Sequence, residues 1–488
     1  MQFRKLLNRN LNTRYSRAEG HDFTEQRNLS VSGVSPVVFW LLLAICAAVG
    51  LLGADVLSQL GIEYVTTTGN AWEKLHPSTY LIVLAFGLWA LETSRQQDSL
   101  LQVLTGQPAA FILLSASLLL MVYNAIAVGG EFSVVIESFI VPALLIYIVR
   151  EVSDNQKRLL AACIHVLFII NSTIGIYEFV TGASLIPPQL VDYLSTGSEI
   201  DMTEWEVSRV SALWGHPLTA TLATVAYLLA NFVMPTSAPF PLLRVVGVSV
   251  SLMALPGFGG RFSLLLFVLY SVYLGVCWAL SFVITNRAPR AGDLIILAGI
   301  FGTVAAITIG IEAGYLDRFI DRLYDDNGSA STRTVAVNLL LGTDTLDILL
   351  GDINGNLPAR LVSAGTPYGV EVFWIAFLLR YGLLVSLAVF PGLICFIVQA
   401  GRDLGFAGVF VSSFFIMSQS GAVGLTAKST VFSCVVLICY SLLPRRQPLA
   451  EATPATGAKL AHGRAYNAIK SWADREGPWP NRGSGAIK

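Results

Sequence analysis

Residues 208–232 read SRVSALWGHPLTATLATVAYLLANF, in which a polar and aromatic start runs into an apolar stretch without a charged residue. An apolar stretch of about 20 residues is long enough to cross a bilayer as a helix. Its first turns contain Arg209, Trp214, His216 and Pro217. One aromatic and one cationic side chain are enough to anchor a helix at the membrane interface. Four such residues together indicate a binding role in addition to anchoring.

The composition of the whole chain is that of a membrane protein. Of the 488 residues, 54% are hydrophobic and only 13% are charged, about half the charged share of a soluble protein. The formal net charge is −1, so no overall field favours nucleic acid as a partner. The six cysteines lie inside apolar runs and are interpreted as small hydrophobic side chains. No Walker loop and no metal-binding spacing is present, so we expect neither a cofactor nor a metal.

The apolar runs predict an all-α fold, a polytopic membrane protein with about 12 transmembrane helices. The predicted spans are 36–56, 78–93, 108–128, 132–149, 159–181, 210–234, 242–257, 262–284, 293–313, 370–397, 404–421 and 429–444. We therefore divide the chain into a cytoplasmic N-terminal segment (1–35), a membrane domain (36–444) and a disordered cytoplasmic tail (445–488).

Cationic side chains predict the orientation, because cytoplasmic loops carry an excess of Lys and Arg. Both terminal segments and the short loops on the same side contain such residues, among them Arg27, Arg95, Arg150, Arg244 and Arg402. Both termini are therefore expected inside. The outer face then carries a large loop at about 314–369, which we expect to be partly helical.

Several arginines on the outer face run against this charge bias. Arg209 and Arg261 each open an apolar run, and Arg318, Arg322 and Arg333 lie in the large loop. Guanidinium groups bind phosphate bidentately and stay charged when partly buried, so several of them together would suit a pyrophosphate. The alternatives are ion pairs with loop aspartates and contacts with lipid headgroups.

Other polar residues also need a place. Asn124, Glu137 and Asn171 lie within predicted spans and should face the bundle interior or a wet cavity, whereas Glu178 should be exposed near the outer end of its helix. In a continuous helix starting at Glu371, Arg380 would lie about 13 Å deeper. That depth requires an anion or a water-filled cavity, or else 370–380 lies flat at the surface.

The order of these segments resembles the O-antigen ligase and polymerase superfamily of bacterial envelope glycosyltransferases. The resemblance covers roughly 160–400. Its parts are GIYEF (175–179), RVSALWGHPLTAT (209–221), GGRFSLL (259–265), ILLGDINGN (348–356) and YGVEVFWIAFLLRYGLL (368–384). In the family the second motif usually has Asn-Pro after the glycine, where this chain has His216-Pro217.

The resemblance implies a polymerase of the bacterial inner membrane that joins oligosaccharide repeat units carried on undecaprenyl pyrophosphate at the periplasmic face. It implies an inverting, metal-independent glycosyl transfer in which Arg209 and Arg261, with Arg318 or Arg322, hold the pyrophosphate. Glu371 or His216 would be the base. Trp214, Arg333 and Arg380 are additional candidates for the cavity. Partners would be the bilayer and the flippase and chain-length regulator of the same pathway.

Two alternatives stay open. Family ligases, which transfer polymer to lipid A core, carry a histidine before the span that follows the large loop, but this chain has none between 217 and 461 and has Glu371 near that place. The departure favours a polymerase over a ligase. A secondary transporter or flippase is the other alternative. The two halves of a transporter usually repeat and its polar residues lie at mid-membrane, whereas this sequence shows no repeat and its polar residues cluster at one face.

Overall fold

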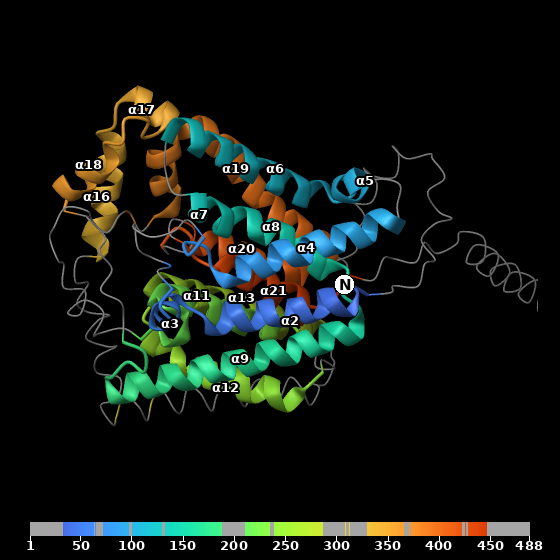
Figure 1. Cartoon of the computed structure of the whole chain (residues 1–488). Coiled ribbons are helices and arrows are strands. Elements are labelled where there is room, and N and C mark those ends of the chain that lie inside the picture. Colours follow the sequence, from blue (N-terminus) through green and yellow to red (C-terminus); the bar gives the residue numbers. More distant parts are fainter. Residues whose placement is uncertain are drawn as a thin grey trace, which may run out of the picture. The chain divides into compact units, whose positions relative to one another are not determined.

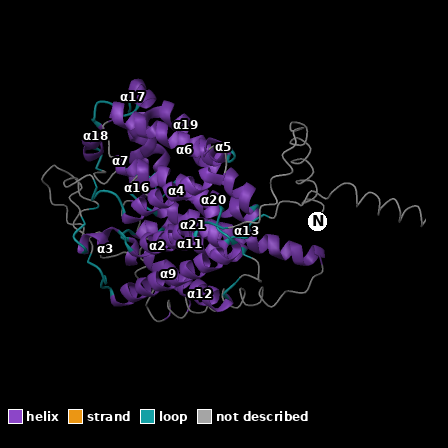
Figure 2. Ribbon diagram, turned by 45° about the vertical axis from the view of Figure 1, so that its right-hand side comes forward, coloured by secondary structure: helices purple, strands orange, loops and turns teal. Residues whose placement is uncertain are grey.

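The computed structural model describes residues 33–62, 64, 72–96, 100–128, 132–187, 210–234, 239–285, 308, 312, 329–365, 370, 372–421, 425 and 428–446. Regular structure in these ranges is entirely helical (Figure 2). The helices discussed below belong to one unit that ends at Pro444. Among the predicted features, the span 293–313 apart from residues 308 and 312, the first part of the large loop (314–328) and the tail from residue 447 lie outside the described residues.

The long helices run roughly alongside one another (Figure 1). They are α2 (Pro36–Leu51), α4 (Pro77–Gln96), α6 (Pro108–Tyr123), α8 (Val141–Arg150), α9 (Asp154–Thr181), α11 (Pro217–Val233), α12 (Pro241–Phe258), α13 (Arg261–Thr285), α19 (Phe373–Leu404), α20 (Phe406–Ser418) and α21 (Val431–Leu442). Short helices mark the two ends. One end holds α3 (Ala54–Gln59), α16 (Ser329–Leu341), α17 (Thr345–Leu350) and α18 (Leu357–Ser363), and the other holds α5 (Leu100–Thr105). We call these the α3 end and the α5 end.

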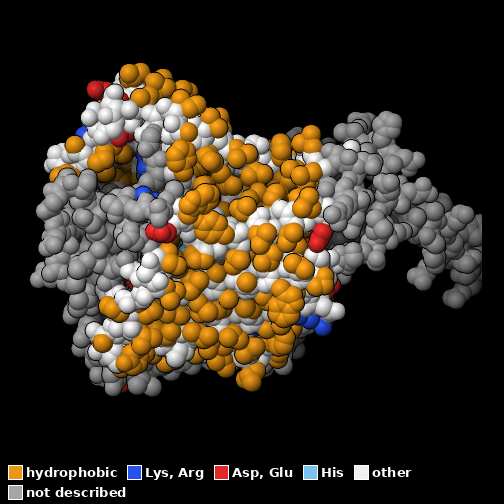
Figure 3. All heavy atoms as spheres, in the orientation of Figure 1, with side chains coloured by type: hydrophobic (Ala, Val, Ile, Leu, Met, Phe, Trp, Pro, Cys, Tyr) orange, Lys and Arg blue, Asp and Glu red, His pale blue; other side chains and the backbone are white. Residues whose placement is uncertain are grey.

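Helices α11 and α21 form the centre of the bundle. Every residue of α21 is buried, and most of α11 is buried against α12, α13, α20 and α21. By contrast, α6 and α19 leave apolar side chains exposed, such as Ile126 (81%) just beyond α6 and Leu387 (63%). Hydrophobic side chains cover most of the face seen in Figure 3. Exposed apolar surface of this extent is stable only against lipid or another protein.

Membrane-spanning capacity agrees with the predicted class. Within the described residues, five helical segments are long and apolar enough to cross a membrane: Pro108–Val128, Phe132–Arg150, Asp154–Thr181, Pro241–Phe258 and Phe373–Leu404. The other predicted spans in these ranges correspond to apolar helices or parts of helices of 10–17 residues, such as Pro77–Thr93 in α4 and Arg261–Cys277 in α13. The chain is thus an all-helical, multi-pass membrane protein by length and composition.

Helix boundaries follow local capping chemistry. Ser153 and Gln156 form a capping box at the start of α9, and Gly182, with φ 68°, ends that helix. The α16 helix ends at Leu341, directly before Gly342. The span predicted from 210 begins as a helix only at Pro217, because Ala212–Trp214 forms a separate short 3₁₀ helix, η3.

The predicted span 370–397 is not one straight helix. Gly382 has φ 75° and ψ 171° and interrupts α19. The ring centroids of Phe377 and Phe390 are 5.4 Å apart, whereas thirteen residues of continuous helix would separate their Cα atoms by about 20 Å. The segment 373–381 therefore folds back on the segment that follows Gly382, and the expectation that Arg380 lies about 13 Å deep in a continuous helix is wrong.

Helices α16–α18 cover the segment that folds back. Ala336 and Leu379 share a small apolar cluster with Val370, and Leu339 and Leu361 pack against it. Arg380 C=O accepts the Asp352 N–H at 3.1 Å. Helices α16–α18 are thereby packed against the first half of α19 at the α3 end.

One buried carboxylate ties helices together at the α5 end. Asp403 accepts from Arg150 Nε (3.1 Å), Gln399 Nε2 (2.7 Å) and Tyr440 OH (2.8 Å). Its side chain is 9% exposed. The three donors come from α8, α19 and α21, so this network holds those helices in register.

Candidate functional site

The start of α11 is built by capping. His216 is the N-cap, and its Nδ1 accepts the Leu218 N–H at 3.2 Å. Pro217 is the first helical residue, where its missing N–H costs nothing. Because Nδ1 accepts, the neutral ring carries its proton on Nε2, and His216 then acts there as a donor rather than as a base.

Tight backbone contacts hold this stretch against the turn between α2 and α3. Gly53 N–H donates to Leu213 C=O at 3.0 Å. A Cβ on Gly53 would lie 2.2 Å from that oxygen, and one on Gly215, whose φ is 69°, would lie 2.6 Å from Ala54 N. These two glycines are therefore required for the close approach.

Trp214 lies inside the bundle. It is 7% exposed, and its ring is 5.7 Å from that of Phe168, which stacks on Tyr227 at 4.2 Å. Its Nε1 has no hydrogen-bond partner among the described residues. The geometry assigns Trp214 a packing role, with one indole N–H left over for a ligand or a water molecule.

The chain next to Arg209 meets the turn that precedes Arg261. Val210 N–H donates to Gly257 C=O at 3.2 Å, and Gly260 N–H donates to Thr221 Oγ1 at 3.1 Å. Arg261 itself is half-buried at the first position of α13. The predicted site residues Arg209, Arg318, Arg322 and Glu371 lie outside the described residues.

The residues that follow α20 contact both Phe262, the neighbour of Arg261, and the start of α19. Gln419 C=O accepts the Phe373 N–H at 3.1 Å, and Trp374 Nε1 donates to Ser420 Oγ at 3.0 Å. A Cβ on Gly421 would lie 2.6 Å from the ring of Phe262. The starts of α13 and α19 therefore both contact the residues that follow α20.

Four polar residues form a cluster at the α3 end, here called the Glu137 cluster: the buried Tyr64, His76 and Glu137, and the half-buried Lys428. Glu137 lies on a π-helical turn, η2 (Ile136–Ile140), and is 1% exposed. Its carboxylate accepts the Tyr64 hydroxyl and the His76 backbone N–H. Lys428 Nζ donates to Tyr64 C=O at 3.2 Å. The expectation that Glu137 faces the interior is confirmed, as it is for Asn124 and Asn171, which are at most 1% exposed.

The His76 ring is held in its neutral form. Burial lowers the pKa of His76 to about 4, against a smaller opposing effect of its bond to Leu52 C=O. That bond, from Nε2, measures 2.6 Å, and Nδ1 accepts the Ser78 N–H at 3.1 Å. His76 thus fixes the turn before α4.

Glu178 was expected to be exposed, and the expectation is wrong. It is 4% exposed at the end of α9. Its carboxylate accepts Leu185 N–H at 2.8 Å and Ala212 N–H at 3.0 Å. The two segments that flank residues 188–209 are therefore tied to one carboxylate, which accounts for its burial.

The remaining described arginines of the candidate site lie in the region covering the α3 end. Arg333 Nε is buried without a hydrogen-bond partner among the described residues. The guanidinium of Arg380 lies 5.6 Å from the centre of the Tyr381 ring. The structure places neither beside Arg261 by any contact among the described residues.

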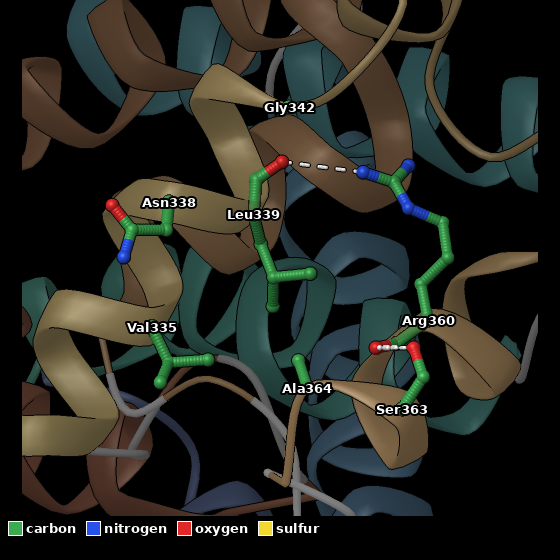
Figure 4. Close-up of a pocket in the computed structure, with 7 residues that line it drawn as sticks. All are labelled: Val335, Asn338, Leu339, Gly342, Arg360, Ser363 and Ala364. Atoms are coloured by element: carbon green, nitrogen blue, oxygen red, sulfur yellow. Dashed lines mark hydrogen bonds between the residues drawn. The ribbon is translucent and has the colours of Figure 1, made fainter.

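A groove lies between α16 and α18 (Figure 4). It is lined by Val335, Asn338, Leu339, Gly342, Arg360, Ser363 and Ala364. Arg360 reaches across it and donates to Leu339 C=O (3.2 Å) and Thr343 Oγ1 (2.6 Å). These bonds cap the C-terminus of α16, which gives Arg360 a structural role. Among the described residues, no group of three or more His, Cys, Asp or Glu side chains is placed to hold a metal ion.

Lys428 and Tyr64 were missed by the sequence analysis. The available signal was a lysine in the short connection before the last apolar run, on the face predicted to carry few cations. Tyr64 had no signal, because its partners lie 73 and 364 positions away.

Comparisons with protein-family models, curated proteins and solved structures found no match to this chain.

His216 permits a direct test of its role. Asparagine is a good N-cap but cannot accept a proton at neutral pH, so His216→Asn is expected to keep the unfolding temperature and any transfer activity near wild type. His216→Ala, the comparison, should lose about 1 kcal/mol of stability with the cap. A fall in activity in the stable Asn variant would restore His216 as the candidate base.

Proposed function

We propose that this protein is a polysaccharide polymerase, which joins oligosaccharide repeat units carried on undecaprenyl pyrophosphate by inverting, metal-independent glycosyl transfer. The observation that carries the proposal is the gathering of three features at the α3 end: the chain beside Arg209, the first turn of α13 with Arg261, and the start of α19. A transporter would be expected to place such groups at mid-membrane instead.

The chemistry requires a positive environment for the leaving group. The acceptor hydroxyl oxygen attacks the anomeric carbon from the face opposite the leaving group, and the bond from that carbon to the pyrophosphate oxygen breaks. Arg209 and Arg261, with Arg318 or Arg322, would stabilise the negative charge that develops on the lipid pyrophosphate. The hydroxyl proton passes to a base.

Glu371 is the preferred candidate for this base. A carboxylate needs no change of tautomer to accept a proton, whereas the Nδ1 of His216 already accepts the Leu218 N–H. Phe373, two residues after Glu371, is bound through its N–H to the turn that also contacts Phe262 beside Arg261. The residues Phe373 and Trp374, which follow Glu371 in the chain, are therefore anchored near the candidate arginine.

Purified protein with lipid-linked repeat units tests the function. Wild-type protein should lengthen the lipid-linked glycan by whole repeat units, and Glu371→Gln should bind the substrate but leave single units unjoined. Transfer of a preformed polymer to lipid A core, without lengthening, would identify a ligase. Movement of intact lipid-linked oligosaccharide across vesicles, without polymer, would identify a transporter.

The proposal places the protein in the bacterial inner membrane with about 12 spans, both termini in the cytoplasm and the α3 end in the periplasm. Reporter fusions at 345–360 are expected to report the periplasm, and fusions at 455–485 the cytoplasm, because the cationic loops favour the inner side. A cytoplasmic signal at 345–360 would contradict both the orientation and the mechanism.

A further inference from the structure

The buried carboxylate of Glu178 stands in an unfavourable place. It is 4% exposed in the last turn of α9, where the negative end of the helix dipole disfavours an anion. Its donors are neutral: Ser184 Oγ (3.0 Å) and Leu185 N–H (2.8 Å) bind Oε1, and Ala212 N–H (3.0 Å) binds Oε2. Among the described residues no ion pair offsets its charge. Burying a carboxylate without a cation costs folding stability.

Ala212, one of these donors, has a strained backbone. Its φ is 48°, in the left-handed region that residues with a Cβ avoid, and it is 2% exposed at the start of η3. Strain of this kind persists only where neighbouring contacts enforce it, and it is concentrated at functional sites. Two unfavourable features, the Glu178 carboxylate and the Ala212 backbone, are therefore joined by one hydrogen bond.

The strained turn is bound to the end of α12. Val210 N–H donates to Gly257 C=O at 3.2 Å. A Cβ on Gly257 would lie 3.1 Å from that of Phe179, so α12 and α9 are in close contact here. Arg209 directly precedes Val210 in the chain, and Arg261 lies four positions after Gly257. Both candidate arginines are therefore joined along the chain to residues that meet at this contact.

We propose that Glu178 is a positioning residue for the glycosyl transfer, an inference that rests on the proposed function. Through its bond to Ala212 it holds the backbone that follows Arg209 against the end of α12. Its role is indirect, because protein donors occupy both of its oxygens. Without the carboxylate, Ala212 can relax to a negative φ and displace Val210, two positions earlier. A displacement of about 1 Å near reacting groups can lower a rate about 10²-fold.

The test measures kcat with full-length protein and lipid-linked repeat units. Glu178→Gln keeps the shape of the side chain but sets an amide NH₂ against an N–H donor, and should lower kcat about tenfold, the loss of one hydrogen bond to a charged group. With Ala212→Gly the left-handed conformation carries no steric penalty, so the effect of Glu178→Gln on kcat should fall to about twofold. If Glu178→Gln does not fold, the shorter carboxylate of Glu178→Asp should show the same dependence. An equal loss of kcat with and without Ala212→Gly would overturn the proposal.

Asp403→Asn is the matched control for a purely structural effect. Asp403 is also a buried carboxylate with three protein donors, but it ties α8, α19 and α21 together at the α5 end. Its substitution should lower the unfolding temperature and leave the kcat of the folded protein unchanged. A fall in kcat as large as that of Glu178→Gln would show that any lost tie between helices slows transfer, and would overturn the positioning role.

Inorganic pyrophosphate separates this inference from the proposed function. Calorimetric titration of the same variants in detergent measures the Kd without any transfer. Glu178→Gln should raise the Kd about fivefold, part of one charge-assisted contact, and adding Ala212→Gly should reverse most of the rise. Wild-type protein that makes no polymer but shows this pattern of Kd values would refute the proposed function alone. Polymer formation with kcat and Kd both unaltered in Glu178→Gln would refute this inference alone, and the absence of both polymer and pattern would refute both.

Discussion

Replacing Arg261 by alanine is expected to slow repeat-unit transfer about 10²- to 10³-fold, the effect of losing one group that stabilises charge on the leaving pyrophosphate. Arg261 stands at the first position of α13, beside a turn held by the Gly260–Thr221 hydrogen bond. The Val210 N–H donates to the C=O of Gly257, near the end of α12 and just before that turn, so Arg209→Ala should produce a loss of similar size. The measurement is the initial rate of polymer formation by purified protein.

Lysine substitutions separate charge from geometry at these positions. Arg261→Lys keeps the positive charge but loses the fork of donors that binds phosphate bidentately, so transfer should remain impaired. Arg402→Ala, an exposed arginine near the end of α19 at the α5 end, is the control and should leave the rate unchanged. Rates near wild type in both Arg209→Ala and Arg261→Ala would refute the pyrophosphate site and leave ion pairs or headgroup contacts as the role of these side chains.

Gly382→Ala is expected to cost about 3 kcal/mol or more of folding free energy. Its φ of 75° and ψ of 171° fall in a region that only glycine occupies readily, where another residue costs about 1–3 kcal/mol. An added Cβ would also lie 2.4 Å from Gly351 N and 2.5 Å from Leu350 C, and such overpacking costs about 1–3 kcal/mol more. The measurement is the unfolding temperature of the purified protein.

Gly275→Ala is the matched control for this substitution. Gly275 lies inside α13, and no atom is within 4 Å of the Cβ that alanine would add. Alanine is favoured over glycine in a helix interior by about 0.5–1 kcal/mol, so this variant should be at least as stable as wild type. Equal unfolding temperatures for the two variants would show that the interruption of α19 is not held by the Gly351–Gly382 contact.

Helix chemistry explains why the membrane class could be predicted. Long apolar runs must bury their backbone hydrogen bonds in a helix wherever water is absent. Local residues then set the ends: Ser153 with Gln156 starts α9, and Gly182 ends it. These signals act within a few residues along the chain, so they can be recognised without knowledge of the fold.

The predictions that failed concern residues whose partners are distant in sequence. Glu178 was expected at the surface, but its carboxylate receives the Ala212 N–H from 34 positions away. Lys428 was missed because its place in the Glu137 cluster depends on its contact with Tyr64, which in turn donates to Glu137. An isolated polar residue in an apolar run shows only that some partner is required, not which one.

The sequence by itself determined that this protein is an all-helical, multi-pass membrane protein and which stretches form its long apolar helices, because apolar length is a local property. Only the tertiary structure decided that α19 folds back at Gly382, since that glycine adopts its conformation against Gly351, 31 positions earlier. It also decided which polar residues meet at the α3 end. Contacts of this kind depend on how helices pack, and many packings are compatible with the same pattern of apolar residues.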